Sequence, residues 1–284
     1  MSALATAASA SGRQVNVPLA VGGALTVLSI GAALLGLAYR PYAPAAVDLL
    51  HRLSPPSSVH LLGTDRFGRD VLSRVLAGGW RSITLGVGAT ALGLAIGLPI
   101  ALVTGFYRGR LDQAVMRLVD ALLSIPTLVF ALLVIVGLGP GLVQAVLALG
   151  VAASPKFVRV VRSAVLEAAS RDYVTAARAR GENALYIQYG EILPSVWPPI
   201  IVEGSINIGF ALIGGAGLSY LGLGTQPPHA DWGVMINEAQ KYISVSVWPL
   251  LGPALAICAA VIGFNLLGEG LRDRLHIRST LRDV

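Results

Sequence analysis

The residue types that bind ions or transfer protons are sparse in this sequence, and the first of interest lie inside an apolar stretch. Glu203 is followed one helical turn later by Asn207, among residues that are mostly apolar. An ionisable side chain at membrane depth is costly and is a functional candidate by default. Both side chains should therefore face protein or a water-filled path. Two interpretations fit equally well: the two residues line a pore, or they form hydrogen bonds between helices, which need only a polar partner.

A second group of charges lies in the segment LGTDRFGRDVLSR, which ends at Arg74. Asp65 and Arg69 are four positions apart, and so are Asp70 and Arg74. Opposite charges at this spacing pair on one face of a helix. The segment is therefore expected to form a short helix at the membrane interface, stabilised by its own ion pairs.

A third group lies in SRDYVTAARARG, where Ser170 and Asp172 are helix start signals and Gly181 is a stop signal. The residues between them that fall at helical spacing are Tyr173, Ala176, Ala177 and Arg180. This spacing predicts a helix of about two turns, which is too short to be stable alone in water. The helix must therefore dock on something, and its alanines offer a shallow face that allows close approach.

None of these groups forms a catalytic or metal-binding arrangement. No G-x-x-x-x-G-K-[ST] phosphate loop is present, so the chain cannot hydrolyse ATP by that chemistry. No nucleophile has a base in a credible context, and we assign no catalytic residue. His60 and His229 stand alone without metal-ligand spacing, so no metal site is expected. Cys258 lies in an apolar run, where a small buried residue without a disulfide partner is expected.

The elements that position these groups are expected to be helices in a membrane. Of the 284 residues, 55% are hydrophobic and 13% are charged, whereas soluble domains have about 25% charged residues. Only helices and closed barrels satisfy every backbone group in lipid, and the period-two alternation of a barrel is absent. Apolar stretches of about 20 residues, long enough to cross the membrane, occur at 17–39, 82–106, 114–137, 142–160, 195–222 and 246–268.

The expected fold class is an all-α integral membrane protein with six transmembrane helices and both termini cytoplasmic. In this orientation fourteen Lys and Arg residues lie inside and seven outside, in line with the positive-inside rule. The net charge of +6 follows this topology, so no nucleic-acid partner is predicted. The stretch 17–39 is interpreted as a retained helix, because its apolar core exceeds the roughly 7–15 residues of a signal peptide. Residues 161–194 then form a cytoplasmic segment between the fourth and fifth helices.

Two further predictions concern single side chains. Asp120 is expected to pair with Arg117, three positions away. Trp232 lies in a loop stiffened by Pro227 and Pro228, and its ring is expected to sit among lipid headgroups.

The alanine pair of the third group is part of a longer pattern. Gly181 follows Ala177 by four residues, and Leu193 and Pro194 lie 12 and 13 residues beyond it. This spacing resembles the EAA loop of binding-protein-dependent ABC importer permeases. Pro194 is expected near the start of the following helix, where its missing N–H costs least.

Three other segments resemble the second permease subunit of dipeptide, oligopeptide and nickel importers. They are HLLGTDRFGRDVLSRVLAGGWRSI (60–83), LSYLGLGTQPPHADWGVMI (218–236) and NLLGEGLRDRL (265–275). The chain also departs from the family pattern. Thr175 and Glu191 replace a Glu and an Ile of the EAA loop, and Gly215 stands where members often carry an acid.

The resemblance implies a transport subunit rather than an enzyme, located in the cell inner membrane as a multi-pass protein surrounded by lipid. It would form half of a pore with a second homologous permease subunit. Two cytoplasmic ATPase subunits would bind ATP and Mg, an extracytoplasmic solute-binding protein would deliver the solute, and this chain would carry no cofactor. The residues expected to contact the ATPase are Asp172, Tyr173, Ala176, Ala177, Arg178, Arg180, Gly181 and Glu182. The residues that would face the binding protein are Asp65, Arg66, Arg69 and Asp70.

The resemblance also implies a division of the chain and a substrate class. Residues 1–60 would hold the N-terminal tail, the first helix and an outer loop. Residues 61–275 would form the permease core, with a coupling loop at 167–194, and 276–284 a cytoplasmic tail. The implied substrates are short peptides. The alternatives are an importer of nickel or another small solute with the same architecture, a membrane-embedded enzyme that uses Glu203 or the outer Asp residues, and a passive channel.

Overall fold

The computed structural model of the protein describes residues 16–226 and 228–280. Pro227, and Arg13 and Arg282, which are two of the fourteen basic residues counted on the inside, lie outside these residues. The described chain is helical apart from its loops, turns and one isolated bridge between Thr64 and Asp70, which confirms the all-α class. The long helices are α1 (Val17–Ala38), α2 (Val71–Tyr107), α5 (Leu142–Ala168), α8 (Leu193–Tyr220) and α10 (Trp248–Thr280). The shorter elements are η1 (Leu49–His51), α3 (Gly109–Leu123), α4 (Thr127–Leu138), α6 (Asp172–Ala179), α7 (Ala184–Tyr186), η2 (Ile187–Ile192) and α9 (Trp232–Gln240).

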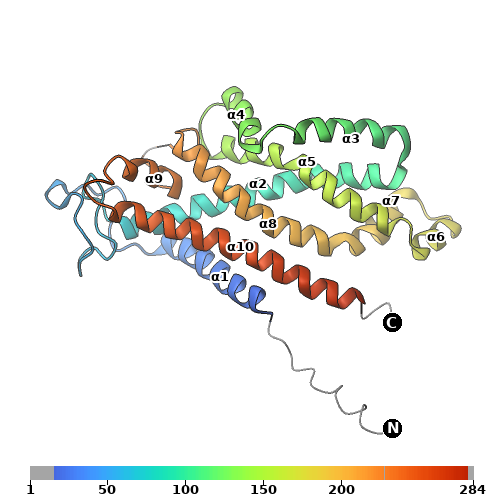
Figure 1. The fold of residues 1–284 in the computed structure, drawn as a ribbon, viewed down its shortest axis with the longest axis horizontal. Helices are drawn as coiled ribbons and strands as arrows, with labels where there is room; N and C mark the ends of the chain where they lie inside the picture. Colours follow the sequence, from blue (N-terminus) through green and yellow to red (C-terminus); the bar gives the residue numbers. More distant parts are fainter. Residues whose placement is uncertain (1–15, 227, 281–284) are drawn as a thin grey trace, which may run out of the picture.

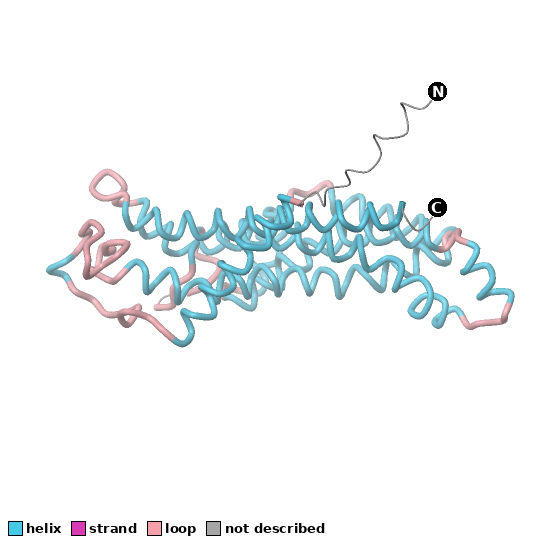
Figure 2. Tube along the Cα trace, turned by 90° about the horizontal axis from the view of Figure 1, so that it is seen from below, coloured by secondary structure: helices cyan, strands magenta, loops and turns pink. Residues whose placement is uncertain are grey.

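The five long helices run side by side along the long axis of the molecule (Figure 1). α2 packs on α5, α1 packs on α10, and α8 contacts α2, α5 and α10. Most loops gather at the two ends of this bundle (Figure 2). We call these the α9 end, which also holds the loop between α1 and α2, and the α6 end, where α3 begins and α10 finishes (Figure 1). The loop positions are those expected for helices that cross one apolar layer, because backbone outside a helix needs other partners for its polar groups.

Five helical stretches of the described chain are long and apolar enough to cross a membrane. They contain the predicted helices at 17–39, 82–106, 142–160, 195–222 and 246–268, within a residue or two at the ends. α2 begins eleven residues earlier than expected, since Asp70 caps it and its first turns form at the α9 end. The stretch 184–220 is one helical run that includes the π-helical turn η2, so Pro194 lies at the start of α8 but inside a longer helix.

The single helix predicted over 114–137 is wrong. This stretch forms α3 and α4, which are bent by 92° at a break between them, and together they make a sixth candidate span only if counted as one. The break follows from Pro126, which has no N–H to donate and disfavours helical backbone at Ile125. Pro155 lies inside α5 without breaking it. Pro155 is itself buried, whereas most of α4 is exposed, so little packing holds the chain straight at Pro126.

Glycine allows α1 to lie unusually close to α10. A Cβ atom added to Gly22 would lie 2.3 Å from the backbone nitrogen of Leu267, and one added to Gly270 would lie 2.4 Å from that of Leu19. Small residues let helix backbones approach in this way and increase the van der Waals contact between helices in lipid. Gly23, the next residue along α1, has nothing within 4 Å of the corresponding position.

We therefore expect Gly22→Val to separate α1 from α10 and to lower the free energy of unfolding by about 1–3 kcal/mol, as overpacked sites do. Gly23→Val is the matched control, with the same change in helix propensity one residue away. It should stay within about 0.5 kcal/mol of the wild type. Thermal unfolding of the purified chain in detergent measures both, and equal shifts for the two variants would contradict the close packing of α1.

For two side chains the observed burial is the opposite of the prediction. Cys258 is exposed on α10 instead of buried. Trp232 is buried instead of interfacial, and its ring N–H donates to the carbonyl of Val75 at 3.0 Å. Neither outcome can be predicted from the local sequence, because contacts with neighbouring helices determine which face of a helix is buried.

Candidate functional site

α6 is the short helix predicted from the third group of charges. It has eight residues, and Gly181 follows it with φ of +82°, a conformation that glycine adopts without strain. The N–H of Gly181 donates to the carbonyl of Arg178, and that of Glu182 to the carbonyl of Ala177, which closes the helix end. The predicted length and the stop at Gly181 are confirmed. α6 begins at Asp172, one of the two predicted start residues, whereas the hydroxyl of Ser170 donates back to the carbonyl of Glu167 and does not cap the helix.

The two alanines of α6 lie in different environments. Val174 and Ala177 are fully buried in a core cluster that includes Val161 of α5 and Ile192 of η2. Ala176 is exposed. The expectation that both alanines share one outward face is therefore wrong, since successive helix positions are turned by about 100°. Ala177 seats α6 on its own chain, and Ala176 remains on the outer surface.

Charged residues surround the exposed part of α6. Asp172, Arg178, Arg180 and Glu182 are all exposed, as is Gly181. Arg180 lies 3.3 Å from Glu191 of η2, and the guanidinium of Arg178 lies 5.0 Å from the ring centroid of Phe106 at the end of α2.

Tyr173 is half-buried, and its hydroxyl donates to Ser195 of α8 at 3.0 Å. Together with the buried seat and the Arg180–Glu191 pair, this bond ties α6 to the helix that follows it. α5 leads into α6 through a three-residue turn, and α7 begins five residues after α6 ends. A displacement of α6 would therefore move α5 and the helical run 184–220 as well, because the segments that connect α6 to them are short.

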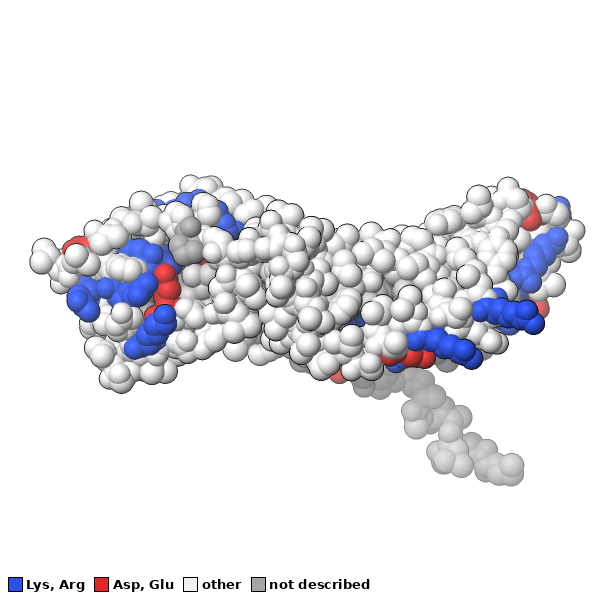
Figure 3. Space-filling view, turned by 90° about the horizontal axis from the view of Figure 1, so that it is seen from above, with Lys and Arg blue, Asp and Glu red and all other residues white. Residues whose placement is uncertain are grey.

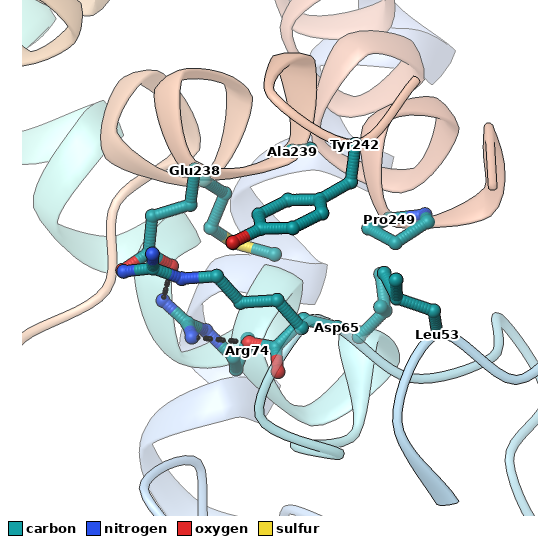
Figure 4. Close-up of a pocket in the computed structure, with 10 residues that line it drawn as sticks. Leu53, Asp65, Arg74, Glu238, Ala239, Tyr242 and Pro249 are labelled. Atoms are coloured by element: carbon teal, nitrogen blue, oxygen red, sulfur yellow. Dashed lines mark hydrogen bonds and ion pairs between the residues drawn. The ribbon is translucent and has the colours of Figure 1, made fainter. Parts of the chain in front are cut away.

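The second group of charges forms a buried cluster at the α9 end (Figure 4). The carboxylate of Asp65 accepts from Arg69 and Arg74, each at 2.6 Å. The carboxylate of Glu238 accepts from the same two arginines, at 2.7 and 2.9 Å. Arg74 lies between the two acids with only 2% of its side chain exposed. The cluster therefore joins the loop before α2, α2 itself and α9.

The structure confirms one predicted ion pair of this group and corrects the other. Asp65 pairs with Arg69 as expected. Asp70 does not pair with Arg74; it accepts from the N–H of Ser73 at 2.7 Å as the cap of α2, and its other oxygen lies 3.0 Å from His60. Residues 61–69 form turns and not a helix, so the predicted interfacial helix is wrong.

Two glycines with positive φ explain why this segment turns. Gly63 has φ of +74° and Gly68 has φ of +72°, values that favour turns over a continuing helix. The side chain of Asp65 supports the turn by accepting from the N–H groups of Phe67 and Arg69. Glu238 was missed by sequence reasoning, because nothing in the MINEAQ segment marks it as the partner of an arginine 164 residues away.

The cavity beside this cluster is too small for a solute. Its volume is about 10 Å³, and it lies among Leu53, Arg66, Met235, Tyr242 and Pro249. That volume holds about one water molecule, whereas ligand sites measure about 300–1,000 Å³. Of the four residues expected to face a binding protein, Asp65 and Asp70 are buried, Arg69 is nearly so, and Arg66 has 31% of its side chain exposed. The cluster thus holds the loop before α2, α2 and α9 together, with Arg66 at its surface.

Polar residues also meet halfway along the bundle. The amide of Asn207 donates to the hydroxyl of Thr90 at 2.9 Å, and both are buried, so this bond links α8 to α2. Glu203 lies 2.6 Å from the ammonium of Lys156 on α5. Of the two interpretations offered for Glu203 and Asn207, hydrogen bonding between helices is observed for Asn207. Lys156 was counted among the fourteen basic residues expected on the cytoplasmic side. It was therefore missed as a partner of Glu203.

Two ion pairs join α3 to α5 on one side of the bundle. Arg162 donates to both oxygens of Asp112 at 2.5 Å. Asp120 pairs with Arg159, so its predicted pairing with Arg117 is wrong. Charged residues gather at both ends of the face shown in Figure 3, with a broad band between them that has few charges. Among the described residues, no group of three or more His, Cys, Asp or Glu side chains could hold a metal ion.

Comparison with known proteins places this arrangement among transport proteins. The family described as "Binding-protein-dependent transport system inner membrane component" matches residues 97–280. The di/tripeptide transport system permease protein DppC of Pseudomonas aeruginosa is 38% identical over 263 residues, which cover 90% of this chain and 87% of that protein. The probable D,D-dipeptide transport system permease protein DdpC of Escherichia coli is 40% identical over 82% of this chain and 78% of its own. The glutathione transport system permease protein GsiD of Pectobacterium atrosepticum is 40% identical over 78% and 73%, respectively.

A solved structure shows the same fold. An inward-facing conformation of the MetNI methionine ABC transporter contains a chain that superposes with a TM-score of 0.59 at 22% identity. The superposition covers 70% of this chain and 93% of that chain.

Proposed function

Because this chain belongs to the family of binding-protein-dependent transport system inner membrane components, and so is a permease subunit of an ABC importer, we propose that it forms half of a pore for short peptides. The other half would be a second, homologous permease subunit. The observation that carries the substrate class is the likeness over most of the chain to permeases named for di/tripeptides, D,D-dipeptides and glutathione, which are all short peptides.

The proposed topology has six spans, with the bent pair α3–α4 counted as one and both termini cytoplasmic. It is supported by the excess of Lys and Arg on the side that holds the α6 end. In this orientation residues 61–275 form the permease core, the α6 end faces the cytoplasm, and the α9 end faces a solute-binding protein. Arg66 is the predicted residue of the outer cluster that is exposed enough to meet that protein.

We propose that α6 is the coupling element. Its exposed surface would sit in a groove of a cytoplasmic ATPase subunit. Ala176 lies at the centre of this surface, and the residues around it are Asp172, Arg178, Arg180, Gly181 and Glu182. Two such subunits would bind ATP and Mg and close on each other. The movement of α6 would pass to α5 and to the run 184–220 as a rigid-body displacement. The buried seat of Val174 and Ala177 supports this, since it fixes α6 to the helices that would move.

Reconstitution tests the proposed function directly. The complex of the two permease subunits and two ATPase subunits is placed in proteoliposomes, with the binding protein outside. It should take up a labelled dipeptide only when ATP is present inside. This chain alone should conduct no dipeptide. Flux through the isolated chain without ATP would favour a passive channel. Uptake of a nickel complex but no peptide would favour the alternative substrate class.

Cysteine crosslinking tests the proposed contact of α6. Cys258 is the only cysteine, so Cys258→Ser provides a background without thiols in this chain. On that background Ala176→Cys should crosslink to the ATPase subunit through a short bifunctional reagent. Val174→Cys is the matched control on the same helix and should not react, because Val174 is fully buried. A complex that transports peptide but gives no crosslink from position 176 would overturn the contact.

A further inference from the structure

A charged pair joins α5 and α8 near the middle of α5, one helical turn from Arg159, which pairs with Asp120 of α3. Lys156 is 14 residues from the start of α5 and 12 residues from its end. At a rise of about 1.5 Å per residue it is roughly 20 Å from either end of the helix. Its ammonium group lies 2.6 Å from the carboxylate of Glu203, which is 10 residues from the start of α8. With α5 as a membrane span, this pair lies within the hydrocarbon layer.

The pair is open on one side in this chain. Lys156 has 42% of its side chain exposed, and Glu203 has 11%. Phe210, one of the exposed large side chains of α8 with 58% of its surface free, lies beside them, with its ring centroid 5.1 Å from the ammonium. A lysine at this depth cannot face hydrocarbon without a large cost, and charged residues in spans face the bundle interior or a water-filled cavity. This face of α5 and α8 is therefore not covered by lipid.

We infer that Lys156, Glu203 and Phe210 line the water-filled path between the two permease subunits and bind the charged ends of a zwitterionic peptide. This inference rests on the proposed function and adds the residues that contact the solute. An ammonium has three N–H donors, and Lys156 is held beside Glu203 as an ion pair. These donors can bind the α-carboxylate of a peptide.

The neighbouring groups suit the other end of the same solute. The carboxylate of Glu203 can accept from an α-ammonium, and the face of Phe210 can hold a cation or an apolar peptide side chain. When no solute is present, the two charges neutralise each other. The empty path then presents no net charge to inorganic ions, and the pair exchanges one ion pair for two when a peptide enters.

Accessibility of position 210 tests the inference without breaking the ion pair. In the reconstituted complex with Cys258→Ser, Phe210→Cys should react with a charged, water-soluble methanethiosulfonate. Val27→Cys on α1 is the control, because Val27 is exposed near the middle of an entirely uncharged helix and should not react. Alanyl-alanine at about nine times its Kd should slow the reaction at position 210 by about tenfold, because only ligand-free sites would react.

Adding Lys156→Met to Phe210→Cys should abolish the protection by alanyl-alanine while the cysteine stays reactive. Failure of Phe210→Cys to react would overturn the inference, because the pair would then be covered by a neighbouring subunit. Reaction without protection, or protection that survives Lys156→Met, would also overturn it. If the wild-type complex takes up no alanyl-alanine at all, the proposed function fails instead, so the two failures are distinguishable.

Discussion

Replacing Arg74 with methionine should lower the free energy of unfolding by about 3–5 kcal/mol, the range for removal of one partner from a buried ion pair. Arg74 is almost fully buried and donates to both Asp65 and Glu238. Without it, the two carboxylates would remain close together with Arg69 as their main partner. For a domain of this size the unfolding midpoint in detergent should fall on the order of 10 °C.

Arg66→Met is the control for this prediction. Arg66 is 3.9 Å from Glu238 and partly exposed, so its removal should change stability by less than about 1 kcal/mol. Arg74→Lys should not restore the wild-type midpoint, since an ammonium cannot reach both acids with a planar fork of donors. Similar midpoints for Arg74→Met and Arg66→Met would show that the buried cluster does not fasten α9 to α2.

Leucine at positions 176 and 177 should separate the two roles of α6. Ala177→Leu adds volume to a fully buried site and should destabilise the chain by about 1–3 kcal/mol. Ala176→Leu changes an exposed site and should leave the unfolding midpoint of the chain unchanged within error. It should nevertheless lower ATP-driven peptide uptake by at least about tenfold, which corresponds to about 1.4 kcal/mol at the contact with the ATPase.

Two measurements on the same samples check this prediction. Thermal unfolding of the purified chain reports packing within the chain, and uptake by the reconstituted complex reports docking. Wild-type uptake with Ala176→Leu would remove Ala176 from the proposed contact. Equal destabilisation by both substitutions would contradict the observed difference in burial between the two alanines.

The helices of this protein could be predicted because their causes are local. Each long helix is a run of apolar residues whose backbone hydrogen bonds close within the run. The stop of α6 at Gly181 is local too, since glycine accepts positive φ there without strain. The break at Pro126 could not be predicted from the proline alone, because Pro155 lies inside α5 without breaking it. The difference lies in the packing around each proline.

The partners of the charged residues could not be predicted in the same way. Spacing along the chain correctly paired Asp65 with Arg69, but it also paired Asp70 with Arg74 and Asp120 with Arg117, which the structure does not. The actual partners include residues 164 and 39 positions away. They meet because the helices that carry them pack together.

Local sequence thus determined where the five long helices lie, that they are apolar enough to cross a membrane, and that a short helix interrupts them before the run 184–220. Tertiary structure decided which face of each helix points inward. It seated Ala177 and exposed Ala176, buried Arg74 between Asp65 and Glu238, and placed Lys156 beside Glu203. The physical reason is that helix hydrogen bonds join residues four positions apart, whereas side-chain contacts depend on how whole helices pack against one another.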